Sequence, residues 1–178
     1  MLFRSEYTKQ GLGILSEVGN RHEEGIAYQT LGHAYARLHN FKEAITHHKQ
    51  SLSIAKEVGT KVQEANVCHL LGHDYQCSGS VSEALDYYRS SVKIYDDIRA
   101  QLQSQDAWKI SFRETHQCAY TSLWRILAEI GETDEALCAA EKGRAQALMD
   151  VLQEQYGVDS LPPESVEPKE MISHMLNN

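Results

Sequence analysis

The stretch LGHAYARLHNFKEA at residues 31–44 decides the fold, because it returns 40 residues later as LGHDYQCSGSVSEA at residues 71–84. A fixed period of about 20–50 residues is typical of stacked repeats rather than of a single globular core. We therefore predict a repeat fold that offers a surface rather than a catalytic centre. Further pairs at the same offset are Glu24/Glu64, Ser51/Ser91, Ile54/Ile94, Lys9/Lys49, Gln10/Gln50, Leu12/Leu52, Ile14/Ile54, Glu17/Glu57, Val18/Val58 and Gly19/Gly59.

Each repeat has the pattern of two helices. In residues 21–58, apolar and small side chains recur at steps of three and four, which places them on one helical face. The pair His39-Asn40 interrupts this pattern, and the pattern resumes at Phe41. Gly19 and Gly59 stand where a helix favours a left-handed C-terminal cap. Each unit is therefore predicted to be a helical hairpin.

Two glycines recur inside the predicted helices. Gly32 and Gly72 occupy one repeat position, although glycine in a helix costs about 1 kcal/mol relative to alanine. A missing side chain allows two helices to approach closely. We therefore expect a close helix–helix contact at this position, with Ala44 and Ala84 as the small partners on the second helices.

A third unit is shifted in register. Leu123 and Ala136 align with the second repeat at an offset of 52 rather than 40, so 12 residues have been inserted. Long helices are expected over 81–103 and 105–130, and Trp124 takes the position of the two glycines. The predicted division is a half repeat at 1–19, repeats at 20–59, 60–103 and 104–157, and a linker or capping tail at 158–178.

The composition excludes several function classes. The net charge is −8 and no cluster of Lys or Arg occurs, which argues against a nucleic-acid or membrane-surface partner. The four cysteines form no Cys-x-x-Cys pair, so free thiols in a reducing cytoplasm are expected. Residues 1–20 carry charges throughout, which predicts neither a signal peptide nor a transmembrane span.

The pattern Leu31-Gly32-x-x-Tyr35, followed by Phe41-x-x-Ala44, resembles the tetratricopeptide repeat, whose usual period is about 34 residues. The stretch LSIAKEVG at 52–59 resembles the longer repeats of the G-protein-signalling-modulator family. It is still more similar to the animal tetratricopeptide arrays associated with a CHAT domain. Residues 106–112 and 140–150 resemble the segment before that caspase-like domain, whose His/Cys pair has no counterpart here. The resemblance implies an all-α fold, a right-handed α-solenoid of about three stacked antiparallel hairpins with a lengthened last repeat.

The resemblance also implies a binding surface, because the first helices of tetratricopeptide hairpins line a concave groove. A groove of amides, imidazoles and arginines suits hydrogen bonding to a peptide backbone or to a carboxylate. The alternative is an ordinary solvated groove whose partner binds elsewhere. The residues expected to face the groove are Gln29, His33, Arg37, Asn66, His69, His73, Gln76, Thr121 and Arg125.

The histidines allow a second interpretation. His69 and His73 are four residues apart, which is a metal-ligand spacing, and His33 is expected on the neighbouring first helix. Histidine could equally replace a small polar residue at this repeat position, and helical pairs of this kind are common. We therefore predict no metal site and no cofactor. His47-His48 is expected on a solvated face of a second helix.

No catalytic constellation is recognisable in the sequence. Cys68 and Cys118 are expected near helix contacts, as small core side chains rather than nucleophiles. No nucleophile-elbow pattern, phosphate-binding loop or paired acid and base is present. The chain is therefore predicted not to be an enzyme.

The resulting hypothesis is a non-catalytic protein–protein interaction scaffold that binds a protein or peptide in its groove, beside a CHAT domain in a longer protein. Residues 2–18 match only the second half of a unit, so we expect the chain to be a fragment of a longer array. An uncovered apolar face at that half unit suggests an alternative function, self-association as a homo-oligomer.

Overall fold

The computed structural model describes residues 11–13, 15, 17–101 and 106–142, and the regular structure in these residues is helical throughout. Residues 133–142, within the predicted repeat at 104–157, are also helical. Residues 143–157 of that repeat, the tail at 158–178 and residues 2–10 lie outside the described residues. The bounded helices are α2 (Arg21–Arg37), α3 (Phe41–Val58), α4 (Lys61–Cys77), α5 (Val81–Gln101) and α6 (Asp106–Ile130).

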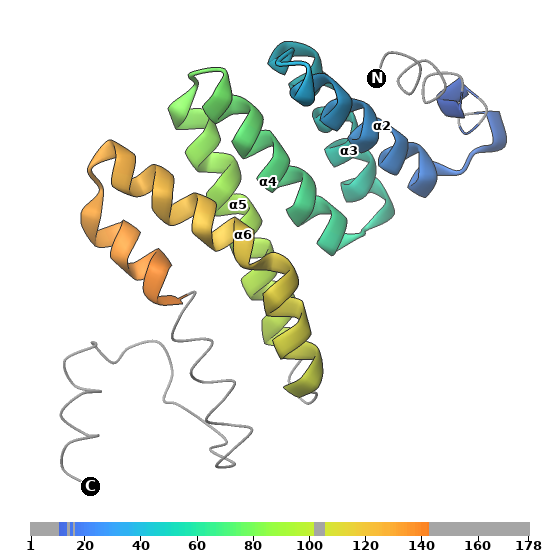
Figure 1. The fold of residues 1–178 in the computed structure, drawn as a ribbon. Helices are drawn as coiled ribbons and strands as arrows, with labels where there is room; N and C mark the ends of the chain where they lie inside the picture. Colours follow the sequence, from blue (N-terminus) through green and yellow to red (C-terminus); the bar gives the residue numbers. More distant parts are fainter. Residues whose placement is uncertain (1–10, 14, 16, 102–105, 143–178) are drawn as a thin grey trace, which may run out of the picture.

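The helices pack in chain order. α2 packs on α3, α3 on α4, α4 on α5, and α5 on α6. Figure 1 shows the hairpins following one another across the view, from α2 on the right to residues 133–142 in orange on the left. The predicted all-α solenoid of stacked hairpins is confirmed. No helix within the described residues is long and apolar enough to cross a membrane.

The helix ends follow from the local sequence. The side-chain oxygens of Asn20 and Asn40 accept hydrogen bonds from the backbone N–H groups of Glu23 and Glu43, which caps α2 and α3 at their N-termini. Gly59 ends α3 in the left-handed conformation, with φ of 80°. This conformation is unstrained for glycine, so the predicted cap is confirmed.

The glycines inside the helices make room for aromatic rings. A Cβ atom on Gly32 would lie 2.3 Å from Cδ2 of His48, and one on Gly72 would lie 2.6 Å from Cδ1 of Tyr88. The predicted close approach is therefore present, but the predicted partners were wrong. A ring from the second helix fills the space, because it packs flat where no side chain projects. Ala44 lies one turn before His48 on the same helix and is also buried.

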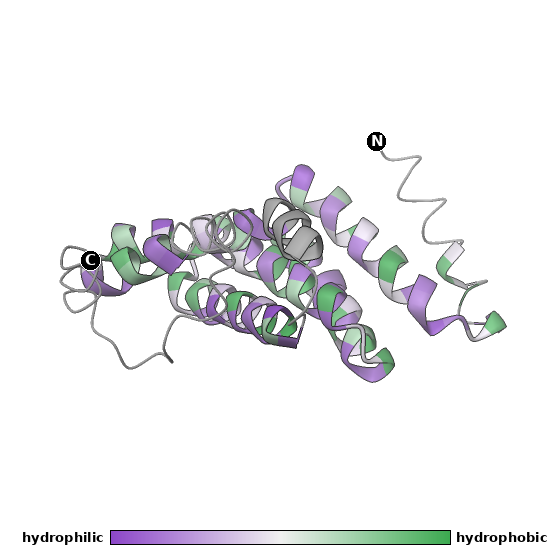
Figure 2. Ribbon diagram, turned by 90° about the horizontal axis from the view of Figure 1, so that it is seen from below, coloured by the Kyte–Doolittle hydropathy of each residue, from purple (hydrophilic) through white to green (hydrophobic). Residues whose placement is uncertain are grey.

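The last two bounded helices, α5 and α6, are long, as expected. α5 contains 21 residues and α6 contains 25. In the third unit, large and small side chains have exchanged register positions. Trp124 stands where the earlier first helices have glycine, and half-buried Ala140 stands where the second helices have His48 and Tyr88. Figure 2 shows purple and green residues interleaved along the coloured helices, as expected of amphipathic helices that each bury one face.

Candidate partner-binding face

The nine predicted groove residues all lie on the first helices of the hairpins. α2 carries three of them, α4 carries four and α6 carries two. We call these nine residues the first-helix face. None of them is fully buried, so each remains at least partly accessible to solvent. Their position on a concave groove stays a prediction.

Two side-chain contacts join α4 to α6 across this face. Nε2 of His69 lies 2.9 Å from the hydroxyl oxygen of Ser122, and the Gln76 amide donates to a carboxylate oxygen of Glu129 at 3.1 Å. Both pairs span 53 residues. Sequence reasoning missed Ser122 and Glu129. Each stands one residue after the third-unit equivalent of its partner, counted at the offset of 52.

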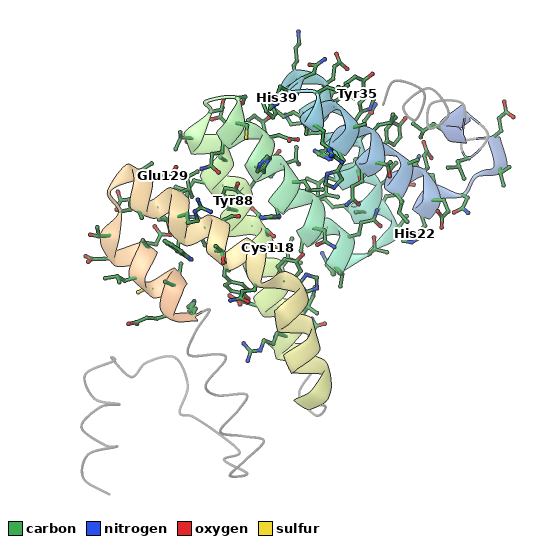
Figure 3. All side chains as sticks on the ribbon, in the orientation of Figure 1. His22, Tyr35, His39, Tyr88, Cys118 and Glu129 are labelled. Carbon is green, nitrogen blue, oxygen red and sulfur yellow. The ribbon has the colours of Figure 1, made fainter. Side chains whose placement is uncertain are left out.

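Two tyrosines of α5 form hydrogen bonds with side chains of α4. The hydroxyl of Tyr95 donates to the side-chain oxygen of Asn66 at 2.6 Å, and the hydroxyl of Tyr88 donates to the side-chain oxygen of Gln76 at 2.9 Å. Gln76 therefore contacts two neighbouring helices, through Tyr88 of α5 and Glu129 of α6, which are both labelled in Figure 3. Burial raises the pKa of Tyr88 to about 12, so this phenol remains a neutral donor at physiological pH. These contacts hold Asn66 and Gln76 in defined positions.

The exposed members of the face are His33, Arg37, His73 and Arg125. The two histidines share a repeat position but differ electrostatically. Burial, followed by the neighbouring His48, lowers the pKa of His33 below its usual value. The carboxylate of Asp74 raises the pKa of His73, whose Nδ1 lies 3.9 Å from it. His73 therefore gains a positive charge at a higher pH than His33.

The three-histidine metal arrangement is not present in the described residues. His69 contacts Ser122, whereas His73 contacts Asp74 and lies 3.7 Å from the sulfur of Cys77. Among the described side chains, no group of three His, Cys, Asp or Glu residues could hold a metal ion. These imidazoles are available for hydrogen bonding instead.

The structure corrects two predictions about single residues. His48 was expected on a solvated face, but its side chain is buried, because Gly32 opens a space beneath it and Asp74 supplies a polar partner. Cys118 was expected in the core, but it is exposed. Cys68 is buried as predicted, and burial raises the pKa of its thiol to about 11.

Residues 19–97 match the tetratricopeptide repeat family. These residues span both complete hairpins, from the turn before α2 into α5. The matched segment of this chain therefore consists of tetratricopeptide repeats. Similarity to this family supports a protein–protein interaction scaffold, and such repeat proteins are typically non-catalytic.

The tetratricopeptide repeats have similar sequences in much longer proteins. Tetratricopeptide repeat protein 28 of Homo sapiens and that of Mus musculus are each 35% identical to this chain over 80 residues. The alignment covers 44% of this chain and 3% of each relative. The similarity therefore concerns the repeats, and the chain matches only a small part of those relatives.

Two solved structures share the fold. The crystal structure of BtubC (BKLC) from P. vanneervenii superposes with a TM-score of 0.68 and 16% identity, covering 92% of this chain and 61% of that chain. The TPR domain of Arabidopsis FLU superposes with a TM-score of 0.55 and 20% identity, covering 72% of this chain and 98% of that chain. At these identities the likeness concerns the fold alone.

Proposed function

We propose that this chain binds a partner protein through an extended peptide segment that lies along the first-helix face. The observation that carries the proposal is the combination of anchored and exposed polar groups on this face. Asn66, His69 and Gln76 are held by neighbouring helices, whereas Arg37 and Arg125 are exposed. Anchored side chains lose little conformational entropy on binding, which favours recognition of a peptide backbone.

The proposal is tested with peptides selected from a random display library against the folded chain. The affinity of a selected peptide is measured for the wild type and for the double variant Arg37→Gln/Arg125→Gln. These arginines are chosen because they lie at opposite ends of the face and outside its buried contacts. We expect the double variant to bind at least about tenfold more weakly, since charge-assisted hydrogen bonds are lost.

The matched control is Lys56→Gln/Lys93→Gln. It also removes two positive charges, but from exposed positions on the second helices α3 and α5. The control should bind like the wild type. Equal losses in both double variants would show a general charge effect, and full affinity in the arginine variant would place the binding surface elsewhere.

We also infer that the array precedes a CHAT domain in a longer protein. The similarity of residues 106–112 and 140–150 to the segment before such domains supports this inference. The transcript or genomic sequence that encodes the chain tests it directly. An open reading frame that continues into a caspase-like domain is expected, and a different following domain would refute the inference.

Self-association is the second candidate function, and the exposure of apolar residues near both ends of the described helices favours it. The side chain of Val18 is 74% exposed and that of Leu137 is 62% exposed. Sedimentation velocity over a wide concentration range distinguishes the two candidates. A rising sedimentation coefficient that the double change Val18→Ser/Leu137→Ser abolishes supports self-association, and a constant monomer value excludes it.

A further inference from the structure

A buried hydrogen-bonded pair joins the first hairpin to the second. Nδ1 of His48, on α3, donates to a carboxylate oxygen of Asp74, on α4, at 2.6 Å. The two residues are 0% and 1% exposed. Nε2 of His48 is also buried and has no hydrogen-bond partner in the described part of the chain. It is turned towards Gly32, where a Cβ atom would lie 2.4 Å away. The contact between α3 and α4 therefore includes a polar pair that is only partly satisfied.

Two more imidazoles share this single carboxylate. The ring of His33, on α2, meets the ring of His48 edge-on with centroids 5.5 Å apart. Nδ1 of His73, on α4, lies 3.9 Å from the second oxygen of Asp74. We call His33, His48, His73 and Asp74 the junction cluster. With three imidazoles and one carboxylate, the cluster is close to neutral when one imidazole is charged and becomes increasingly positive as the others gain protons.

The other titratable groups around Asp74 do not offset this charge. Burial raises the pKa of Cys77, on α4, and raises that of Tyr88, on α5, to about 12. Both groups are therefore neutral between pH 5 and pH 8. Burial alone would raise the pKa of Asp74, but the hydrogen bond from His48 and the nearby imidazole of His73 hold it below its usual value. Asp74 thus stays ionised in mild acid, and the imidazoles determine the charge of the cluster.

The next junction has no such pair at the same register. Tyr88, on α5, takes the place of His48, and Ile126, on α6, takes the place of Asp74 at the offset of 52. Both side chains belong to one apolar cluster and are 1% and 0% exposed. The hydroxyl of Tyr88 is satisfied by Gln76, whereas the first hairpin has Ala36 at the corresponding position. The polar junction is therefore specific to the contact between the first and second hairpins.

We propose that the junction cluster is an acid-sensitive joint, which holds α2 and α3 against α4 at neutral pH and lets them open ahead of α4–α6 in mild acid. The sign follows from proton linkage. Opening separates the half of the His33 ring that is covered in the closed state from the ring of His48 and leaves it in water, where an imidazole titrates near its ordinary value of about 6.5. The pKa of His33 is lowered in the closed state, so the open state binds more protons and acid favours opening. Asp74 raises the pKa of His73, but both residues lie on α4, so the carboxylate stays beside His73 when α2 and α3 open.

Hydrogen exchange of the wild-type chain at pH 7.5 and pH 5.5, corrected for the intrinsic exchange rates, tests the joint directly. Each additional proton bound on opening makes opening about tenfold more favourable per pH unit. Peptides from α2 and α3 should therefore lose more protection than those from α5 and α6, by up to about tenfold, which is the limit for one histidine that titrates at about 6.5 in the open state. Equal changes in all helices, or unchanged protection of α2 and α3, would overturn the proposal.

A matched variant copies the second junction onto the first. The triple change Ala36→Gln/His48→Tyr/Asp74→Ile places the residue types found at positions 76, 88 and 126 on the equivalent register positions. The selective loss in α2 and α3 should disappear in this variant. His69 and His116, whose pKa values burial lowers, remain in it and report any acid effect from outside the cluster. A selective loss that persists in the triple variant would refute the assignment to the cluster.

A single variant serves if the triple variant does not fold. Asp74→Asn keeps an acceptor for the Nδ1–H group of His48 but removes the negative charge. The pH at which α2 and α3 open should then rise, because charged imidazoles lose their only neighbouring carboxylate in the cluster. An unchanged opening pH would show that the cluster does not control the joint.

Discussion

The two junctions between neighbouring hairpins have the same geometry but opposite chemistry. At the first, His48 of α3 forms a buried hydrogen bond with Asp74 of α4, whereas at the second Tyr88 of α5 packs in an apolar cluster with Ile126 of α6. In both hairpins the ring lies over a glycine of the first helix. The repeat therefore fixes where a ring is placed, and the identity of that ring and of its neighbour decides whether the junction depends on charge.

Other contacts are the same in both hairpins. Ser51 and Ser91 each donate to a first-helix carbonyl oxygen, of Gly25 and Ala65, at 2.8 Å. Tyr35 stacks on His47, and Tyr75 stacks on Tyr87 in the same way. These contacts lie within one hairpin, so both of their partners repeat together. A junction joins different repeats, and its two sides can therefore diverge.

The largest effect is expected from breaking the polar junction. Asp74→Ala leaves His48 buried without a partner for either nitrogen, which should destabilise the fold by about 3–5 kcal/mol. The apolar counterpart, Ile126→Ala, should cost about 2–4 kcal/mol through the cavity that it leaves. Urea unfolding at pH 7.5 measures both. If Asp74→Ala is the milder change, the buried pair of His48 and Asp74 does not stabilise the first junction.

The glycines beneath the rings come next. Gly32→Ala and Gly72→Ala should each cost about 1–3 kcal/mol, because the new methyl group overlaps a ring that is fixed by its own hydrogen bond. Gly32→Ala should be the worse, since its Cβ would approach the ring more closely. Thermal unfolding measures the difference. Gly13→Ala is the control, because nothing lies within 4 Å of its Cβ position, and it should be neutral or stabilising.

At the repeated serines we expect a smaller loss of unfolding free energy, which should be equal in the two hairpins. Ser51→Ala and Ser91→Ala each remove one buried hydrogen bond and should each cost about 1 kcal/mol. Chemical unfolding of the two variants in parallel checks this equality. A clear difference between them would mean that the two hairpins are not equivalent within the repeat.

The smallest effect is expected at the surface. Arg89, on α5, binds Glu135 through two hydrogen bonds at 2.9 and 2.5 Å, but both side chains are more than 40% exposed. Arg89→Gln should therefore cost at most about 0.5 kcal/mol, and the effect should shrink at high salt. Unfolding at low and high ionic strength tests this. Lys49→Gln, at the equivalent position of α3, provides the matched comparison.

Features that depend on near neighbours in the chain could be predicted from the sequence. Gly59 was expected as a helix cap because a left-handed residue is needed there, and it adopts that conformation. The pattern of apolar residues predicted the helices, and α5 and α6 are as long as expected. The nine residues of the first-helix face were assigned to first helices, and all of them lie there.

Features that depend on the neighbouring repeat could not be predicted. The sequence placed His48 on a solvated face of a second helix, and Asp74 was not singled out at all. Each is buried only because the other satisfies it. No periodicity of a single helix reports such a pair, because its members stand on different hairpins 26 residues apart.

The sequence by itself determined the repeat, the helices, their caps and the position at which a ring packs on glycine, because these are set by residues within one unit. Only the tertiary structure decided which polar groups are buried and which remain available on the first-helix face. The physical reason is that the burial of a polar group depends on its partner. In a stacked array that partner belongs to the next hairpin.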